Sequence, residues 1–305
     1  MILFALLLAV VPVRAGPLDY KDVPFEDSVT PEPGGFTVRF PSPVTSPFPK
    51  NDVVWAHYSV PEGPGPHPCV IVLPVMAAPN VWIETRFINQ FKKDGFAVLW
   101  LEMPYQFNRR PNALQPSGQI FLARTAKRLS FNFRQSVLDA RRAMAWLRKR
   151  PEIDRDRIGV FGVSLGAIVG AAAYSVDPTP HYAVLLLGGA NFPTLVTASS
   201  LTGPWVKKMG LKPGEVLEAW KDIDPTDYTA KNKGKRILLI NCRGDTVIPA
   251  ANALRLKDAF PDSRQLWLPL GHYTAIVHLL WIPRYVSRVF RENLVKKTIN
   301  PAVSP

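Results

Sequence analysis

The chain alternates short apolar runs with longer segments in which apolar residues recur at helical spacing. Runs of the first kind are typical of β-strands, and segments of the second kind are typical of α-helices. The predicted strands are residues 36–40, 53–60, 69–73, 96–101, 157–161, 182–187, 236–242 and 265–268. The predicted helices are residues 81–93, 120–149, 168–174 and 250–260, followed by further helices from Tyr273, one of which begins at Pro283.

Strands that alternate with helices predict an α/β fold, in which helices cover both faces of a mostly parallel, eight-stranded sheet. The run 69–73 (CVIVL) contains no charged or amide side chain, as expected for a strand buried on both faces. The chain has 305 residues, of which 47% are apolar, and no interdomain linker. Residues 51–305 are therefore expected to form one domain.

Two segments are expected to lie outside this regular alternation. Residues 16–50 are rich in proline and predict a mostly irregular arm over the body, with 36–40 as its strand. Residues 191–235 are polar, with helical patches around Trp205 and Trp220. This insertion is expected to form a small cap above the carboxyl ends of the strands.

Residues 1–15 resemble a secretory signal peptide. Residues 1–13 carry no charge and are too few to span a bilayer, and Val13-Arg14-Ala15 fits a small-residue cleavage site. No Lys or Arg precedes the apolar run, which leaves an uncleaved anchor or a mis-assigned start as alternatives. The favoured prediction is export, to the periplasm or the cell exterior.

The net charge of +13 gathers in part on residues 124–150, where Asp139 is the single acid among many Lys and Arg. Such a surface fits nucleic acid, an anionic glycan or lipid, or simply solvent. Aromatic residues do not interleave with the basic ones as they do in nucleic-acid modules, so no nucleic-acid partner is expected. A solvated helix face is favoured over membrane contact, and the oligomeric state is left open.

The chain has two cysteines, Cys69 and Cys242. In an exported protein, such a pair is a candidate disulfide. In the expected sheet, however, two other strands separate the strands that carry them. At about 4.8 Å per strand the two residues lie roughly 14 Å apart, which is too far for a disulfide. Two buried free thiols are therefore expected.

The sequence Gly162-Val163-Ser164-Leu165-Gly166 joins a predicted strand to a predicted helix. A serine in so sharp a turn takes a strained backbone conformation and projects its hydroxyl from the sheet. Glycine is needed two residues before and two residues after it, because a side chain there would meet neighbouring backbone. The helix that follows aims its free N–H groups at whatever the serine attacks. The alternative is a glycine-rich turn without chemistry.

A candidate acid and a candidate base follow in the loops after later strands. Asp245 comes after strand 236–242, and His272 comes after strand 265–268. A serine nucleophile needs such a base and an acid that orients it. The rival base, His278, lies in an apolar helical segment and is expected to be a packing residue.

With these motifs, in the order serine, aspartate, histidine, the chain resembles the α/β-hydrolases from about residue 52 to residue 295. The segment 153–166 (IDRDRIGVFGVSLG) is similar to the nucleophile region of the dienelactone hydrolase, acetyl xylan esterase and prolyl oligopeptidase-like branch. Met103-Pro-Tyr-x-x-x-Arg109-x-Pro111 resembles a loop of uncharacterised esterase-like members. The resemblance implies an α/β-hydrolase fold and a serine esterase, with Ser164 as the nucleophile, His272 as the general base and Asp245 as the acid that orients it.

The resemblance also implies an oxyanion hole made of backbone N–H groups, with Leu165 as one donor. The second donor is expected in the loop after strand 69–73. Many members carry His-Gly there, whereas this chain has Pro74-Val75-Met76. Pro74 has no N–H to donate, which leaves Met76 or Val75, and Met76 is the candidate. Ala167 replaces a glycine of many relatives and leaves the chemistry intact.

Tyr105, Arg109 and Trp82 are the candidate substrate-binding residues. The expected substrate is a small-molecule or glycan ester with a short acyl chain, acetyl to butyryl, because the cap should wall the acyl group; no metal or cofactor is expected. The alternatives are a lipase-like enzyme whose cap opens into a lipid groove, a peptidase of the prolyl oligopeptidase type, and a non-catalytic binding protein of the same fold. No propeller precedes the fold, which weighs against the peptidase.

Overall fold

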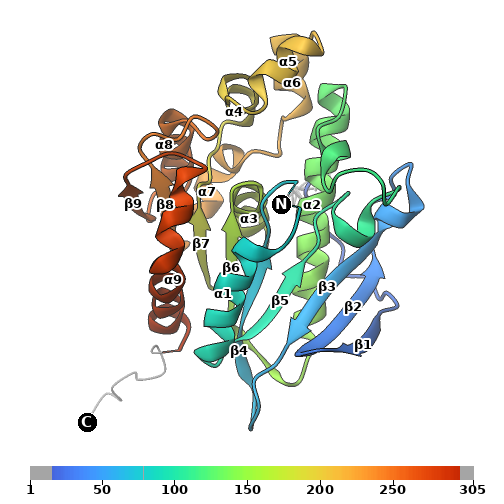
Figure 1. The fold of residues 1–305 in the computed structure, drawn as a ribbon, viewed down its shortest axis with the longest axis vertical. Helices are drawn as coiled ribbons and strands as arrows, with labels where there is room; N and C mark the ends of the chain where they lie inside the picture. The colour runs from blue at the N-terminus through green and yellow to red at the C-terminus, as the bar shows by residue number, and fades with distance from the viewer. Residues whose placement is uncertain (1–15, 78, 296–305) are drawn as a thin grey trace, which may run out of the picture.

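The computed structural model describes residues 16–77 and 79–295. The described residues form a nine-stranded sheet (Figure 1) in the order β1-β2-β3-β5-β4-β6-β7-β8-β9. The strands are β1 Ser28–Glu32, β2 Gly35–Pro41, β3 Val53–Ser59, β4 His67–Leu73, β5 Ala97–Leu101, β6 Ile153–Val163, β7 Tyr182–Leu186, β8 Ile237–Cys242 and β9 Arg264–Leu268.

The sheet is parallel from β5 through β4, β6, β7 and β8 to β9, whereas β1, β2 and β3 pair antiparallel at the other edge. The expectation of a mostly parallel sheet is thus confirmed. The carboxyl ends of the parallel strands all meet at one edge of the sheet, which is where ligands bind in open α/β sheets.

Helices cover both faces of the sheet. Two of them, α1 and α9, lie in front of it in Figure 1, and α2 and α3 lie behind it. The helices of the body are α1 Trp82–Lys93, α2 Ala126–Arg148, α3 Leu165–Val176, α8 Ala250–Ala259 and α9 Ile282–Phe290, the last with Pro283 in its first turn as expected. A 3₁₀ segment, η5 Thr274–Leu280, precedes α9 in place of the expected α-helix.

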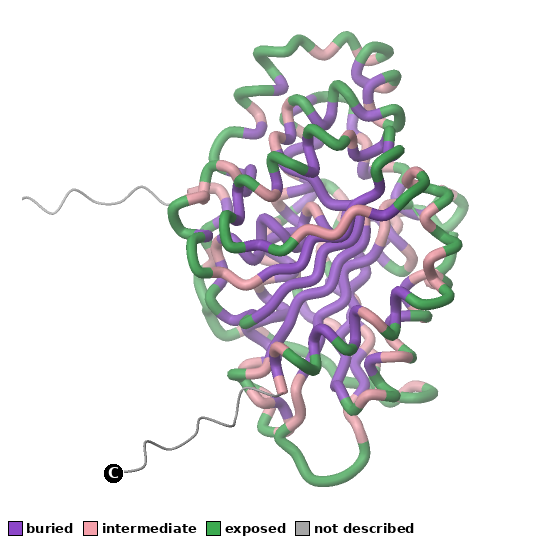
Figure 2. The backbone as a smooth tube through the Cα atoms, turned by 90° about the vertical axis from the view of Figure 1, so that its left-hand side faces the viewer, coloured by how far each residue is buried: buried purple, intermediate pink, exposed green. Residues whose placement is uncertain are grey.

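Side chains of the central strands divide between two cores. On β4, Cys69, Ile71 and Leu73 pack in the core under α2 and α3, whereas Val70 and Val72 pack in the core under α1 and α9. Successive side chains of a strand point to opposite faces, so an uninterrupted apolar run is what a strand between two helix layers requires. Figure 2 shows these strands as the buried centre of the molecule.

The helix α2 begins later than predicted, at Ala126. The side chain of Thr125 accepts a hydrogen bond from the N–H of Arg128 at 3.2 Å, so Thr125 caps the helix. A separate 3₁₀ turn, η3 Gln119–Phe121, occupies the start of the predicted helix.

Residues 16–50 are mostly irregular, as predicted, but the prediction of a single strand there is wrong, because β1 also forms, pairs with β2 and extends the sheet beyond β3. β2 matches the predicted strand at 36–40. Residues 16–27 contain no helix or strand and lie against α2, where Leu18 is fully buried.

Several basic residues of α2 hold this arm, so the prediction of a solvated helix face is wrong in part, although Lys127 and Lys149 are exposed. Arg134 donates to the carbonyl of Pro17 and Arg141 to that of Leu18, while Arg148 pairs with Asp22 at 2.9 Å. These donors face the chain's own N-terminal arm rather than solvent.

The insertion at residues 191–235 is helical, and most of it stands above the sheet in Figure 1, whereas its last helix lies lower, against α3 and α8. Its helices are α4 Phe192–Ala198, α5 Gly203–Lys208, α6 Pro213–Ala219 and the short α7 Thr229–Asn232. Trp205 lies in α5, and Trp220 follows α6, as the helical patches in the sequence predicted.

Cys69 on β4 and Cys242 on β8 are separated by β6 and β7, and both are free and buried, as predicted. The predicted signal peptide at residues 1–15 lies outside the described residues. Among the described residues no helix is long and apolar enough to cross a membrane.

Candidate active site

The turn between β6 and α3 places Ser164 at the carboxyl edge of the sheet. Ser164 has φ 53° and ψ −114°, backbone angles that residues other than glycine rarely adopt. A Cβ on Gly162 would lie 2.2 Å from the carbonyl oxygen of Gly166, and one on Gly166 would lie 2.0 Å from that of Leu73. The predicted strain and the need for both glycines are therefore confirmed.

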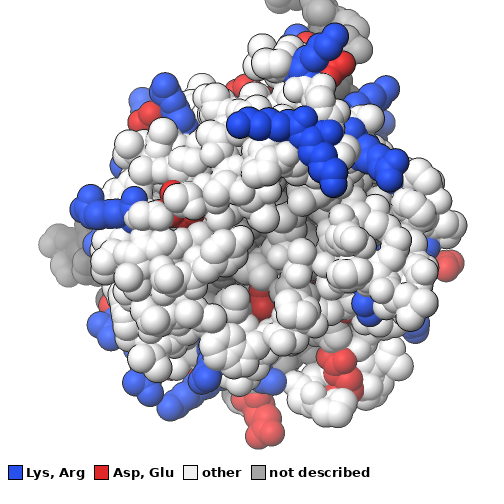
Figure 3. All heavy atoms as spheres, turned by 45° about the horizontal axis from the view of Figure 1, so that its top comes forward, with Lys and Arg blue, Asp and Glu red and all other residues white. Residues whose placement is uncertain are grey.

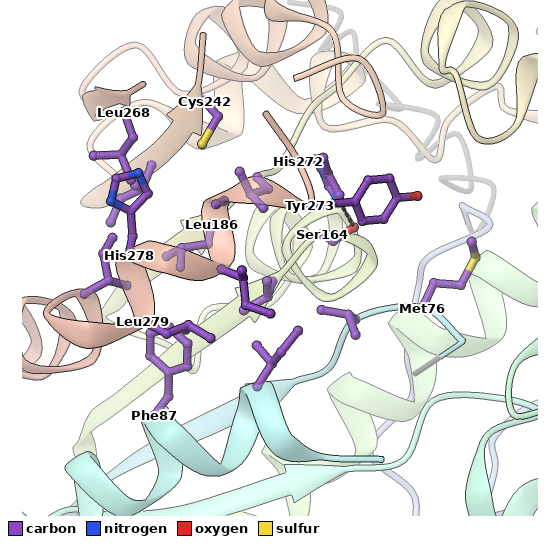
Figure 4. A pocket seen from close by; sticks show the side chains of 18 of the residues that line it. Met76, Phe87, Ser164, Leu186, Cys242, Leu268, His272, Tyr273, His278 and Leu279 are labelled. Atoms are coloured by element: carbon purple, nitrogen blue, oxygen red, sulfur yellow. Dashed lines mark hydrogen bonds between the residues drawn. The ribbon is translucent and has the colours of Figure 1, made fainter. Parts of the chain in front are cut away.

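The structure brings the three residues of the predicted triad together. The Oγ of Ser164 lies 3.0 Å from Nε2 of His272, and Nδ1 of His272 lies 2.8 Å from Oδ2 of Asp245. Figure 4 marks the first of these hydrogen bonds. The other carboxylate oxygen of Asp245 accepts the N–H groups of Val247 and Ile248, at 2.9 and 2.7 Å. The aspartate is thus held by its own loop while it orients the imidazole.

Two glycines allow the loops that carry Asp245 and His272 to touch. The N–H of Gly244 donates to the carbonyl of Leu270 at 2.8 Å. A Cβ on Gly244 would approach that carbonyl oxygen to 2.9 Å, and a Cβ on Gly271 would approach the oxygen of Gly244 to the same distance. Because β8 and β9 are adjacent, these short loops leave the two side chains within hydrogen-bond reach.

The N–H groups of Leu165 and Met76 have no acceptor among the described residues. Leu165 is the first residue of α3, where an N–H has no partner within its helix, and Met76 lines the same cavities as Ser164. The N–H of Val75, by contrast, donates to Oε1 of Glu84 at 2.9 Å. Of the two donors that the sequence left open in this loop, Met76 is the one whose N–H is free.

A buried side chain also holds the carbonyl of Val75. Nε2 of Gln106 donates to that oxygen at 2.7 Å, and Oε1 of Gln106 faces the N–H of Met103 at 3.3 Å. Gln106 and Glu84 are each 1% exposed. Burial raises the pKa of the Glu84 carboxyl, against the hydrogen bond from Val75. Both polar groups of the Val75 backbone are therefore fixed by side chains from separate segments.

Ser164 opens into a large apolar cavity of about 320 Å³. Figure 4 shows Ser164, His272 and Tyr273 at one end of it and Phe87 and His278 at the other. Its walls are mainly aliphatic and aromatic side chains of α1, β6, β7, β8 and the segment η5. In Figure 3, Lys and Arg gather on the upper part of the face, and the hollow below them is bordered mostly by uncharged side chains.

A second apolar cavity, of about 90 Å³, meets Ser164 from the side of the cap. Phe192, Leu195 and Trp220 of the cap form part of its wall, together with Phe121 and Ile168 of the body. The cap therefore borders the serine, as the sequence suggested.

The predicted roles of Tyr105 and Arg109 in substrate binding are wrong, because both side chains are buried away from the two cavities. Arg109 is fully buried and pairs with Asp139 at 2.7 Å. The hydroxyl of Tyr105 accepts from Arg128 at 2.7 Å. Trp82 lines neither cavity; it is 46% exposed at the start of α1 and stacks against Arg86.

Sequence reasoning missed Glu84 and Gln106, which fix the loop that carries Met76. One signal was present: Glu84 shares helical spacing with Phe87 and Phe91, so an acid lies on the buried face of α1. His278 is a wall residue of the large cavity rather than a packing residue, and its ring faces Trp281. No cluster of candidate metal ligands is found among the described residues.

Known structures share this fold. An acetyl xylan esterase from a Paenibacillus species has a TM-score of 0.65, with 18% identity over 87% of this chain and 89% of that one. An acylaminoacyl peptidase of Pyrococcus horikoshii has a TM-score of 0.64, with 17% identity over 89% of this chain and 42% of that one. The Escherichia coli protein Esterase YjfP is 23% identical over 68% of this chain and 80% of its own length.

The sheet order and these likenesses establish the α/β-hydrolase fold. The model of the prolyl oligopeptidase family matches residues 132–285, just over half of the chain. The chain belongs to that family, which makes it a serine hydrolase of the esterase or peptidase kind. The resemblance drawn from the nucleophile region is thereby confirmed.

Proposed function

We propose that the protein is a serine esterase that cleaves carboxylic esters through an acyl-enzyme, with Ser164, His272 and Asp245 as its triad. The observation that carries the proposal is the continuous chain of hydrogen bonds from Ser164 through His272 to Asp245. Two free backbone N–H groups, of Leu165 and Met76, lie on the same site and support an oxyanion hole.

In this mechanism Nε2 of His272 takes the proton of the Ser164 hydroxyl as Oγ forms a bond to the ester carbonyl carbon. The carbonyl oxygen becomes an oxyanion that the N–H groups of Leu165 and Met76 stabilise. The bond to the alkoxy oxygen then breaks, and that oxygen leaves with the proton from His272. Water, deprotonated by the same imidazole, releases the acid from the serine.

The walls of the two cavities favour esters over peptides. No Lys, Arg, Asp or Glu is among the residues that line either cavity. A charged chain terminus taken out of water is stabilised best by an opposite charge, and these walls offer none. An uncharged ester makes no such demand. Because the cavity on the side of the cap is small, we include short acyl chains in the proposal.

The proposal is tested by labelling with a fluorophosphonate, which reacts with an activated serine. We expect the wild type to be labelled and to hydrolyse simple esters, and Ser164→Ala to do neither. His272→Ala should lower kcat by about 10³-fold or more. His181→Ala is the matched control, because His181 is exposed and lines neither cavity. Equal activity of Ser164→Ala and the wild type would disprove the proposal.

A further inference from the structure

We infer that the substrate is an uncharged ester with a small acyl group and a large apolar alcohol. The acyl group would occupy the cavity of about 90 Å³ on the side of the cap, and the alcohol the cavity of about 320 Å³. The inference rests on the proposed esterase function and adds to it which part of the ester each cavity holds.

The position of His272 assigns the two cavities. The leaving alkoxy oxygen must reach Nε2 of His272, because it takes its proton from that atom. His272 and the neighbouring Tyr273 line the large cavity, and neither of them lines the small one. Ser164 lines both. The alcohol therefore leaves the reacting carbon toward the large cavity, and the acyl chain extends toward the small one.

The oxyanion donors agree with this assignment. A tetrahedral carbon bonded to Oγ of Ser164 has three other substituents: the oxyanion, the alkoxy oxygen and the acyl chain. Leu165 lines the small cavity and Met76 lines both, so the oxyanion lies where the two cavities meet. With the alkoxy oxygen on the side of His272, the acyl chain is left with the direction of Leu165 and the cap.

The two volumes set the sizes of the groups. An apolar cavity of about 150 Å³ holds a molecule the size of benzene. The small cavity is well below that volume and suits a chain of a few carbon atoms, whereas the large one exceeds it about twofold. Its far wall is formed by Phe87 of α1 and Leu279 of η5, so a long alkyl or ring-bearing alcohol would bury its apolar surface there.

Two isomeric esters separate the assignment from its reverse. Hexyl acetate has a small acyl group and a long alcohol, and ethyl hexanoate has the opposite arrangement; both contain the same atoms and release a primary alkanol. We expect kcat/KM to favour hexyl acetate by about tenfold or more, since each misplaced methylene in an apolar pocket costs about tenfold or more. Equal values, or a preference for ethyl hexanoate, would overturn the inference.

Variants of each wall localise the effect. Leu195 of α4 lines only the small cavity, so Leu195→Ala should raise the relative activity on ethyl hexanoate. Ile276 of η5 lines only the large cavity, so Ile276→Trp should lower the ratio of hexyl acetate to ethyl acetate hydrolysis. Leu280→Trp is the matched control, because Leu280 lies on the same segment, is 85% exposed and lines neither cavity.

Fluorophosphonate labelling distinguishes failure of the substrate assignment from failure of the proposed esterase function. Labelling of Ser164 together with a preference for ethyl hexanoate, or with hydrolysis of neither ester, overturns the substrate assignment and leaves an activated serine. Absence of both labelling and hydrolysis overturns the esterase itself. A shift of specificity by Leu280→Trp as large as that by Ile276→Trp would show that the large cavity does not hold the alcohol.

Discussion

Gln106 controls the direction of a backbone N–H that it does not touch. The carbonyl of Val75 and the N–H of Met76 belong to one planar trans peptide and point in opposite directions. Gln106 holds the carbonyl at 2.7 Å, so it also sets where the N–H of Met76 points. We expect Gln106→Ala to lower kcat by about 10-fold to 100-fold, less than loss of an oxyanion donor, with little change in KM.

Burst and steady-state kinetics on one ester measure this effect. Gln90→Ala is the control, because the Gln90 amide donates a hydrogen bond to the Asp94 side chain and Gln90 lines neither cavity. An increase in KM with kcat unchanged would mean that Gln106 shapes the cavity instead of orienting the oxyanion donor.

At the scale of elements, His57 joins three strands at the antiparallel edge of the sheet. Its ring on β3 lies 2.9 Å from Glu32, the last residue of β1, and 3.3 Å from Glu102, which follows β5. Burial opposes the charge on His57, but the hydrogen bonds to Glu102 and Glu32 outweigh it and raise the pKa of His57 above its usual 6.5.

This raised pKa makes stability depend on pH. A group whose pKa is higher in the folded state stabilises the fold fully below its unfolded pKa, and that contribution disappears as the pH rises through the folded pKa. We expect the wild type to lose stability relative to His57→Gln as the pH rises above the usual pKa of 6.5, as measured by urea unfolding. If the difference in free energy of unfolding between the two proteins did not change with pH, the role of His57 would be contradicted.

The elements that the sequence predicted are those whose pattern is set by burial. The strand β4 has an apolar side chain at nearly every position because helices cover both of its faces. The strand β1 (SVTPE) is almost entirely exposed and contains Pro31, so its sequence shows no alternation of apolar and polar residues that would predict a strand. β1 forms through backbone hydrogen bonds to β2, and such bonds do not require a particular pattern of side chains.

The residues of the site also divide into those that the sequence pattern predicts and those that it does not. Ser164, Asp245 and His272 follow predicted strands, and parallel strands bring their carboxyl ends together. Arg109 was misassigned because a fully buried arginine and a ligand-binding arginine look alike in sequence; its partner Asp139 is on α2, far along the chain. The small cavity depends on how the cap packs, which no local pattern encodes.

At the scale of the whole molecule, Leu18 attaches the N-terminal arm to the body. Its side chain is fully buried in the core under α2, whereas Val23 on the same arm is 47% exposed. We expect Leu18→Ala to destabilise the protein by about 2–5 kcal/mol, as buried leucines do, and Val23→Ala to have little effect. Urea unfolding of both variants measures the difference, and a loss for Leu18→Ala as small as that expected for Val23→Ala would mean that Leu18 adds nothing to the folded core.

The arginines of α2 hold this arm largely through neutral acceptors. Arg134 and Arg141 donate to the carbonyls of Pro17 and Leu18, and Arg142 donates to that of Pro41. The net charge of +13 counts every acid and base of the chain, so attachment of the arm leaves it unchanged. We expect this charge to make copies of the protein repel one another at neutral pH, most strongly at low ionic strength, which opposes association through the apolar surface of the open cavity at Ser164.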